Sequence, residues 1–149
     1  MRESILIIDF GSQVTKHIAR RIREIGVFSQ VIPFSELEKE KIDKDIIKGI
    51  IFSGGPRSVD KRNAPKISSF VYNLDIPILG ICYGLQLIAR QFKGDITPSH
   101  DREFGKRHLF INKNSPLFEK VYIPKKKYQN WMSHSDKVSK LHLTLKKIG

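Results

Sequence analysis

Apolar residues in the first half of the chain come in short runs, each followed by a turn that contains glycine. Residues 5–8 (Ile-Leu-Ile-Ile), 49–52 and 76–81 form three such runs. A run without polar alternation predicts a strand that is buried on both faces, which is typical of a parallel sheet covered by helices. We therefore expect an α/β fold in which an open, mostly parallel sheet is flanked by helices.

Segments with helical spacing alternate with these runs. The first has apolar residues three or four positions apart and closes at a glycine; its members are Val14, Ile18, Ile22, Ile25 and Gly26. We expect further helices at 65–74 and 85–92, and a strand at 27–32 that Pro33 ends. Beyond residue 94 the pattern predicts an antiparallel appendage that includes 107–112, and residues 141–145 alternate like a strand.

Composition excludes several classes of protein. The 149 residues carry 27 Lys and Arg against 15 Asp and Glu, a net charge of +12, but no basic stripe is interleaved with aromatic residues, so we expect no nucleic-acid partner. No apolar run approaches the roughly 18 residues that span a bilayer and no signal peptide is evident, so we expect a cytoplasmic protein with no membrane partner. The length predicts one domain over 1–149, and we assign no metal site.

The segment 80–84 (Gly-Ile-Cys-Tyr-Gly) is the strongest candidate for chemistry. It joins a buried strand to a helix, and this places Cys82 on a sharp turn at the carboxyl edge of the sheet, where ligands of such folds bind. The following helix N-terminus would lower the pKa of the thiol. We interpret Cys82 as a nucleophile, and the alternative is a small core cysteine.

Two further turns follow strands at the same edge. Residues 53–56 (Ser-Gly-Gly-Pro) could point backbone N–H groups at an oxyanion, or could form a plain turn. Asp9 ends the first strand at this edge. Its carboxylate could belong to the site, or it could be the N-cap of the helix that follows.

Five segments together resemble one family. They are 9–13 (Asp-Phe-Gly-Ser-Gln), 53–56, 80–86 (Gly-Ile-Cys-Tyr-Gly-Leu-Gln), 102–105 (Arg-Glu-Phe-Gly) and 131–138 (Trp-Met-Ser-His-Ser-Asp-Lys-Val). In this order they resemble the class I glutamine amidotransferases, and the first, fourth and fifth resemble the GMP synthetase branch. The resemblance implies a flavodoxin-like fold that is incomplete at its C-terminus.

What the resemblance implies is an enzyme that hydrolyses glutamine and supplies ammonia for the conversion of XMP to GMP. It implies Cys82 as the nucleophile and the backbone N–H groups of Gly55 and Tyr83 as the oxyanion hole. The residues implied to bind glutamine are Gly54, Gln86, Ser133, His134 and Asp136. It implies no cofactor in this chain, since ATP and Mg²⁺ belong to a synthetase (ATP pyrophosphatase) domain, which is the implied partner. The alternatives are that Gln86 is a solvated residue in the first turn of a helix and that 133–136 form an ordinary polar turn.

One part of the family pattern does not occur in these 149 residues. Family members take the general base and its carboxylate from a His-Pro-Glu motif, and here no His precedes Pro. We therefore expect the chain alone to be inactive and, because the closing strand and helix are missing, only marginally stable. Three hypotheses stay open: an amidotransferase segment of a GMP synthetase, a non-enzymatic remnant, or the glutaminase subunit of another class I amidotransferase.

Overall fold

The computed structural model describes residues 2–56, 58, 59, 61–111 and 115–140, with 98–104 and 133–135 described by their backbone alone. The chain divides into two compact units, Met1–Ile88 and Ala89–Gly149. Both units fall inside the range expected to form one amidotransferase domain, so that assignment stays a prediction.

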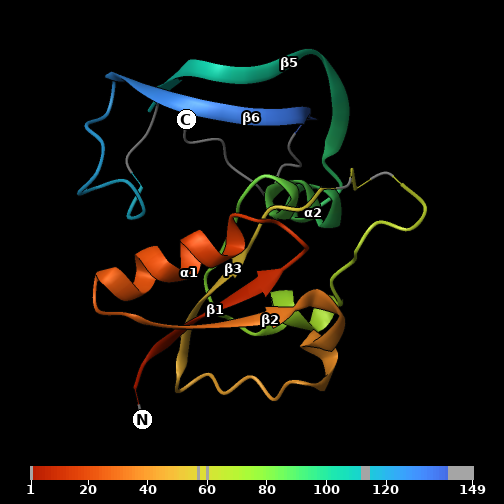
Figure 1. Ribbon diagram of the computed structural model, residues 1–149, viewed down its shortest axis with the longest axis vertical. Coiled ribbons are helices and arrows are strands. Elements are labelled where there is room, and N and C mark those ends of the chain that lie inside the picture. The colour runs from red at the N-terminus through yellow and green to blue at the C-terminus, as the bar shows by residue number, and fades with distance from the viewer. Residues whose placement is uncertain (1, 57, 60, 112–114, 141–149) are drawn as a thin grey trace. The chain divides into compact units, whose positions relative to one another are not determined.

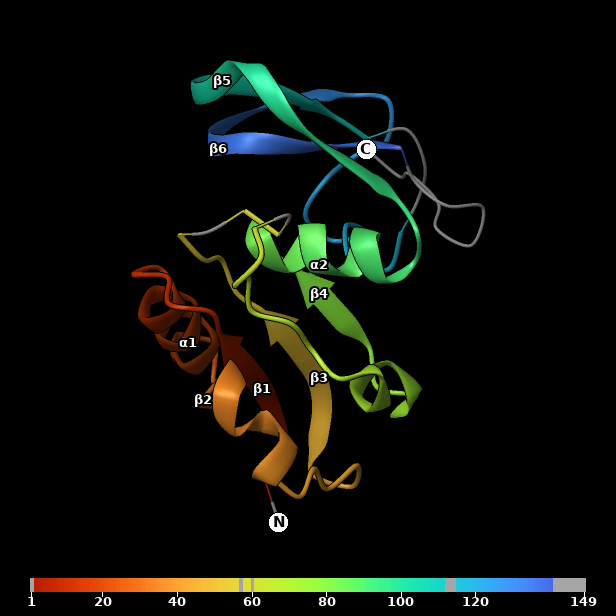
Figure 2. The same ribbon diagram turned by 90° about the vertical axis from the view of Figure 1, so that its right-hand side faces the viewer.

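The first unit contains a parallel sheet of four strands (Figures 1 and 2). The strands are β1 (Ser4–Asp9), β2 (Phe28–Pro33), β3 (Ile47–Phe52) and β4 (Ile78–Gly80), in the spatial order β2-β1-β3-β4. Ile7 of the central strand pairs with Val31 on one side and Ile51 on the other. The expected α/β fold with a parallel sheet is confirmed, as are the strands that the apolar runs predicted.

Successive side chains of a strand point to opposite faces of a sheet, and here helical segments cover both faces. Leu6 and Ile8 pack in a core with two 3₁₀ helices, η1 (Phe34–Lys39) and η2 (Ser69–Asn73). On the β2 side, Ser29 donates a hydrogen bond to the carbonyl oxygen of Ala19 in α1 (Thr15–Glu24) at 3.2 Å. The core also includes the start of α2 (Tyr83–Gln91).

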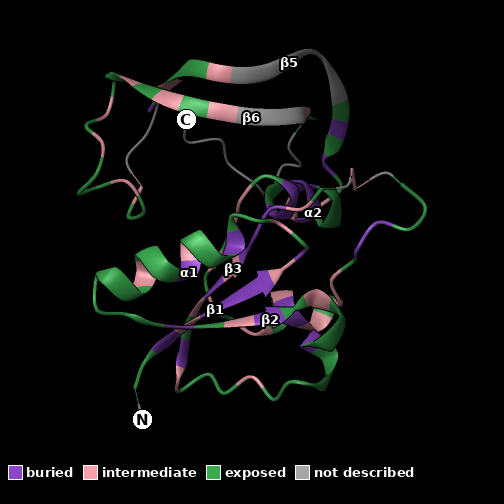
Figure 3. Cartoon of the chain, in the orientation of Figure 1, coloured by how far each residue is buried: buried purple, intermediate pink, exposed green. Residues whose placement is uncertain are grey.

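The core is apolar and rich in aromatic rings, and the buried positions follow the central strands (Figure 3). The ring of Phe10 lies 5.3 Å from that of Tyr83 and 6.0 Å from that of Phe52. The buried members of this core are Leu6, Ile8, Phe10, Ile32, Leu37, Ile47, Ile50, Phe52, Val71, Tyr83 and Leu87. The turns that follow β1, β3 and β4 are therefore built on a rigid support.

Two helical predictions need correction. The helix expected at 65–74 is the short 3₁₀ helix η2. In α1 the buried residues are Thr15 and Ala19, whereas Val14 and Ile25 are 47% and 76% exposed. The buried face of α1 is thus rotated around the helix axis from the face that the apolar residues predicted. The difference arises because this face includes the polar residue Thr15.

The second unit contains the predicted antiparallel element. Strand β5 (Asp95–Phe110) pairs with β6 (Lys127–Lys140), so the strands are longer than the sequence suggested. Residues 141–145, expected to form a strand, lie outside the described residues. Within the part of the chain that is described, no helix has the length and apolar character needed to cross a membrane.

Candidate functional site

The turns that follow β1, β3 and β4 come together at the carboxyl edge of the sheet, to which all three strands point (Figure 2). A Cβ built on Gly54 would lie 3.2 Å from the Oγ of Ser12 and 3.7 Å from the Cβ of Cys82. The structure therefore brings the predicted cysteine turn and the predicted Gly-Gly turn into contact.

Cys82 occupies the turn between β4 and α2 with a left-handed backbone, at φ +50°. Such a conformation costs a non-glycine residue about 1–3 kcal/mol and persists only where its surroundings enforce it. Here Ile81 N–H donates to Phe52 O at 2.9 Å. On the other side of the turn, Gly84 N–H donates to Ser53 O at 3.1 Å. The end of β3 thus holds the cysteine turn from both sides.

The glycines on either side of Cys82 are required by space. A Cβ on Gly84 would lie 2.3 Å from the carbonyl oxygen of Phe52, and a Cβ on Gly80 would lie 2.6 Å from the backbone N of Leu85. Strand and helix can approach this closely only with glycine at both positions. The predicted strand, sharp turn and helix are therefore present.

The Cys82 side chain is exposed, which does not fit the alternative of a core cysteine. The protein around it nevertheless removes part of the hydration of the thiolate, and this burial raises the pKa of Cys82 above its ordinary value. The sequence predicted a lowered pKa from the N-terminus of α2, and burial shifts the pKa in the opposite direction. The thiol therefore keeps its proton at neutral pH, and attack on a carbonyl needs a base.

The Gly-Gly turn is enclosed by its neighbours. Gly54 is buried and Gly55 half-buried. A Cβ on Gly55 would lie 3.1 Å from Phe10 O and 3.3 Å from the Cγ of Tyr83. The turn is therefore packed between the turn after β1 and the cysteine turn, unlike a plain surface turn.

The side chain and the backbone of Tyr83 have different surroundings. The ring is 2% exposed, and its hydroxyl donates to the carbonyl oxygen of Pro65 at 2.6 Å. The side chain is thus part of the core. The N–H belongs to the first residue of α2 and so lies at the N-terminus of that helix. The backbone of Tyr83, unlike its side chain, therefore belongs to the cysteine turn.

A polar group that sequence analysis did not identify connects the turn after β1 to the Gly-Gly turn. The Thr15 hydroxyl lies 2.8 Å from the Asp9 carboxylate and 3.0 Å from the Ser53 hydroxyl. Asp9 is not the N-cap of α1, since that position is Val14 and no side chain caps it. Only a polar residue at a buried helix position, Thr15, could have signalled this group in the sequence.

Gln86 lies in the first turn of α2 and is 8% exposed. The alternative of a solvated helix residue is therefore wrong. Its Oε1 has no hydrogen-bond partner within the described part of the chain. A buried amide oxygen without a partner is costly, so this atom is a candidate acceptor for a ligand.

The remaining predicted residues belong to the second unit. Ser133, His134 and Asp136 lie on β6, where they pair with Phe104, Glu103 and Pro98 of β5; the alternative of a polar turn is thus wrong. The side chains of Ser133 and His134 lie outside the described ones, and Asp136 is half-buried. That these three residues bind glutamine stays a prediction.

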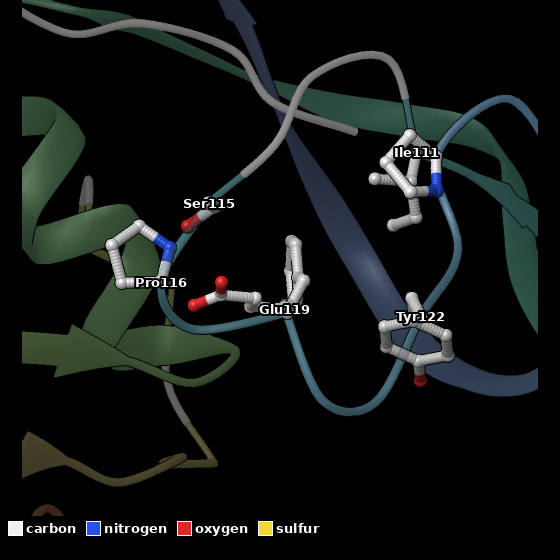
Figure 4. Close-up of a pocket in the computed structure, with 7 residues that line it drawn as sticks. Ile111, Ser115, Pro116, Glu119 and Tyr122 are labelled. Atoms are coloured by element: carbon white, nitrogen blue, oxygen red, sulfur yellow. The ribbon is translucent and has the colours of Figure 1, made fainter.

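The second unit also has a cavity of about 420 Å³. Figure 4 shows its lining residues, which come from the segment between β5 and β6. The lining residues are Ile111, Ser115, Pro116, Phe118, Glu119, Tyr122 and Pro124. None of them is a predicted site residue. Among the residues that the structure describes, no cluster of three or more His, Cys, Asp or Glu is placed to hold a metal ion.

Comparisons with known proteins show the family of this chain. The family model for class I glutamine amidotransferases matches residues 6–148. A GMP synthase (glutamine-hydrolysing) of Agrobacterium fabrum is 50% identical over 139 residues, which are 93% of this chain and 26% of the relative. One of Mesoplasma florum is 47% identical over 147 residues, which are 97% of this chain and 28% of the relative. The chain thus spans about a quarter of the length of these curated relatives and matches their N-terminal part.

Solved structures show the same fold. A GMP synthase subunit from Thermoplasma acidophilum superimposes with a TM-score of 0.79 at 27% identity, covering 95% of this chain and 69% of the other. A glutamine amidotransferase of Thermotoga maritima superimposes with a TM-score of 0.67 at 15% identity, covering 92% and 62%. Since the family model matches nearly the whole chain, this protein belongs to the class I glutamine amidotransferases.

Proposed function

We propose that this chain is the glutamine-hydrolysing part of a GMP synthase and that Cys82 is its nucleophile. The observation that carries the proposal is the left-handed, exposed Cys82 on a strand-to-helix turn packed against Gly54. The Cys82 sulfur attacks the side-chain amide carbon of glutamine, the C–N bond breaks, and ammonia leaves. A water molecule then attacks the γ-glutamyl thioester, which releases glutamate and regenerates the thiol.

The oxyanion of each tetrahedral intermediate needs preorganised donors close to the sulfur. We assign this role to the backbone N–H groups of Gly55 and Tyr83. The packing of Gly55 against the Tyr83 ring, and the place of Tyr83 at the start of α2, support the assignment.

Glutamine itself is bound by Gly54, Gln86, Ser133, His134 and Asp136 in this proposal. The strongest support comes from Gln86, whose buried Oε1 lacks a partner within the described residues and can accept an N–H of the substrate. The contact between Gly54 and the Cys82 turn supports a pocket with no side chain in the way.

The turnover of glutamine by this chain alone is limited by proton transfer. The raised pKa of Cys82 calls for a base, and the 149 residues contain no His-Pro pair of the kind that supplies it in the family. We therefore propose that the chain binds glutamine and forms covalent adducts but turns over little. In the complete reaction the ammonia passes to a cytoplasmic synthetase partner, which uses ATP and Mg²⁺ to convert XMP to GMP; this chain itself needs no cofactor.

A test uses the 149-residue chain and its Cys82→Ala variant. Each is treated with the chloromethyl ketone analogue of glutamine, with and without glutamine, and glutamate release is measured in parallel. The proposal expects stoichiometric labelling of Cys82 that glutamine suppresses, with little turnover. Labelling that glutamine does not suppress would favour the non-enzymatic remnant. Turnover that depends on Cys82 would instead show that a base is present, and His134→Ala would test one candidate.

A further inference from the structure

Thr15 and Ser53 are buried hydroxyl residues that form a polar group with the half-buried Asp9. The group has no role in the reaction above, although Ser53 precedes the Gly-Gly turn. The Ser53 Oγ lies 3.0 Å from the Thr15 Oγ1 and 3.1 Å from the carbonyl oxygen of Gly54. The two hydroxyl residues are 0% and 1% exposed. Water therefore does not compete for these hydrogen bonds, and their geometry is fixed by the group itself.

The number of protons decides which way the hydrogen bonds run, because each hydroxyl has one proton to donate. The Asp9 carboxylate accepts from Gly11 N–H at 2.9 Å and from Thr15 at 2.8 Å. A charged acceptor makes the stronger bond, so Thr15 gives its proton to Asp9. The Ser53 proton is then shared between the Thr15 oxygen and the Gly54 carbonyl, which lie at nearly equal distances.

The hydrogen bond from Ser53 to the Gly54 carbonyl also affects the direction of the Gly55 N–H bond. The Gly54 carbonyl and the Gly55 N–H belong to one peptide unit, and the described part of the chain has no cis peptide bond. In a trans peptide the C=O and N–H bonds point in opposite directions. When Ser53 holds the carbonyl on the buried side, the Gly55 N–H points away from Ser53. Two adjacent glycines would otherwise leave this peptide free to rotate.

We propose that Ser53, braced by Thr15 and Asp9, is a positioning residue that keeps the Gly55 N–H aimed at the oxyanion. The inference rests on the proposed function, in which that N–H is an oxyanion donor, and it adds the side chains that orient the donor. The turn after β1 thereby acts on the reaction through the backbone of the Gly-Gly turn.

Four variants of the 149-residue chain separate this role from general stability. Ser53→Ala removes the hydroxyl that holds the Gly54 carbonyl. Thr15→Val removes its brace with little change in shape, and Thr15→Ser restores the hydroxyl. Ser4→Ala is the matched control, because Ser4 is also buried, at 2% exposed, and its Oγ has no partner within the described residues.

Two measurements are made on each variant. The ¹⁵N–¹H residual dipolar coupling of Gly55 reports the direction of its N–H bond without any ligand. The rate of Cys82 alkylation is measured with two reagents. Sulfur adds to the ketone carbon of the glutamine chloromethyl ketone and gives a tetrahedral oxyanion before alkylation, whereas iodoacetamide is attacked directly at its CH₂ carbon. In both reactions the final C–S bond to the CH₂ carbon forms as the halide leaves, and the thiol proton passes to the buffer.

The proposal expects a changed Gly55 coupling in Ser53→Ala. It expects a smaller change in Thr15→Val, in which Ser53 keeps its bond to the Gly54 carbonyl but loses the neighbour that fixes the position of its hydroxyl. The chloromethyl ketone rate should fall at least ~10-fold in Ser53→Ala, while the iodoacetamide rate stays within about twofold, since oxyanion donors act only on the carbonyl. Thr15→Ser and Ser4→Ala should resemble the parent chain in both measurements.

Two results would overturn the proposal: an unchanged Gly55 coupling in Ser53→Ala, or an equal loss of the chloromethyl ketone rate in Ser4→Ala. Failure of the proposed function looks different. In that case the parent chain shows no glutamine-suppressed labelling, while the Gly55 coupling still decides whether Ser53 orients the peptide.

Discussion

Single residues in the first unit are constrained by space or by backbone strain, and the two constraints act at different positions. Gly84 must be glycine because the carbonyl of Phe52 occupies the volume of a Cβ. Gly26 has φ +83° but no atom within 4 Å of its Cβ position, so conformation alone constrains it. Cys82 accepts the strained conformation that glycine would adopt more easily, and this is typical of a functional residue.

Gly84→Ala should lower the free energy of unfolding by about 3 kcal/mol or more, because the clash at 2.3 Å is with backbone that cannot rotate away. Gly26→Ala should cost only about 1–2 kcal/mol, which is the strain of the left-handed region. Urea unfolding followed by circular dichroism measures both. Equal costs would mean that strand β3 and α2 are not packed as closely as described.

The pH dependence of Cys82 alkylation should be displaced to higher pH. Because burial raises the pKa of this thiol, the iodoacetamide rate should reach half its maximum above the pH found for N-acetylcysteine under the same conditions. The same pKa shift makes the free energy of unfolding depend on pH. The folded state holds the thiol proton more tightly than the unfolded state, so Cys82 stabilises the fold fully below the ordinary thiol pKa. This stabilisation is lost as pH rises through the thiol pKa of the folded state. Cys82→Ser should remove that slope, and a midpoint at or below that of N-acetylcysteine would contradict the account.

At the scale of elements, the parallel strands could be predicted from the sequence because their burial on two faces leaves an unbroken apolar run. The buried face of α1 could not be predicted, because the hydroxyl of Thr15 finds its hydrogen-bond partners outside the helix. These partners are Asp9, at the end of β1, and Ser53, which is 38 residues away in the sequence. The turns of Cys82 and Gly54 were both identified, but their contact depends on strand order. The segment 65–74 contains serines and Asn73, which favour turns, and it forms a 3₁₀ helix instead of the predicted helix.

The 3₁₀ helix η2 should contribute to stability through one side chain. Val71 is 0% exposed and belongs to the core, so Val71→Ala should lower the free energy of unfolding by about 1.5–3 kcal/mol. Ser69, at the start of the same helix, is exposed, and Ser69→Ala should stay within about 0.5 kcal/mol. The comparison is made by urea unfolding, and similar values for the two variants would contradict the docking of η2 on the core.

For the molecule as a whole, the buried apolar residues are unevenly divided between the two units. The core cluster lies within Leu6–Leu87, in the first unit, whose central strands β1 and β3 each have a neighbour on both sides. In the described part of the second unit, the buried hydrophobic residues are Ala89, Ile96 and Ile111, and β5 pairs only with β6. A sheet of two strands is marginally stable on its own.

Hydrogen exchange should therefore differ between the units. Amides of β1 and β3 should exchange only on global unfolding, whereas those of β5 and β6 should exchange at least ~10-fold faster through local opening. Mass spectrometry of peptic fragments measures this, and low urea should accelerate exchange of β1 and β3 while leaving that of β5 and β6 nearly unchanged. Equal protection with the same urea dependence would contradict the expectation. It would mean that the two units open together, and would then favour the single cooperative domain predicted for 1–149.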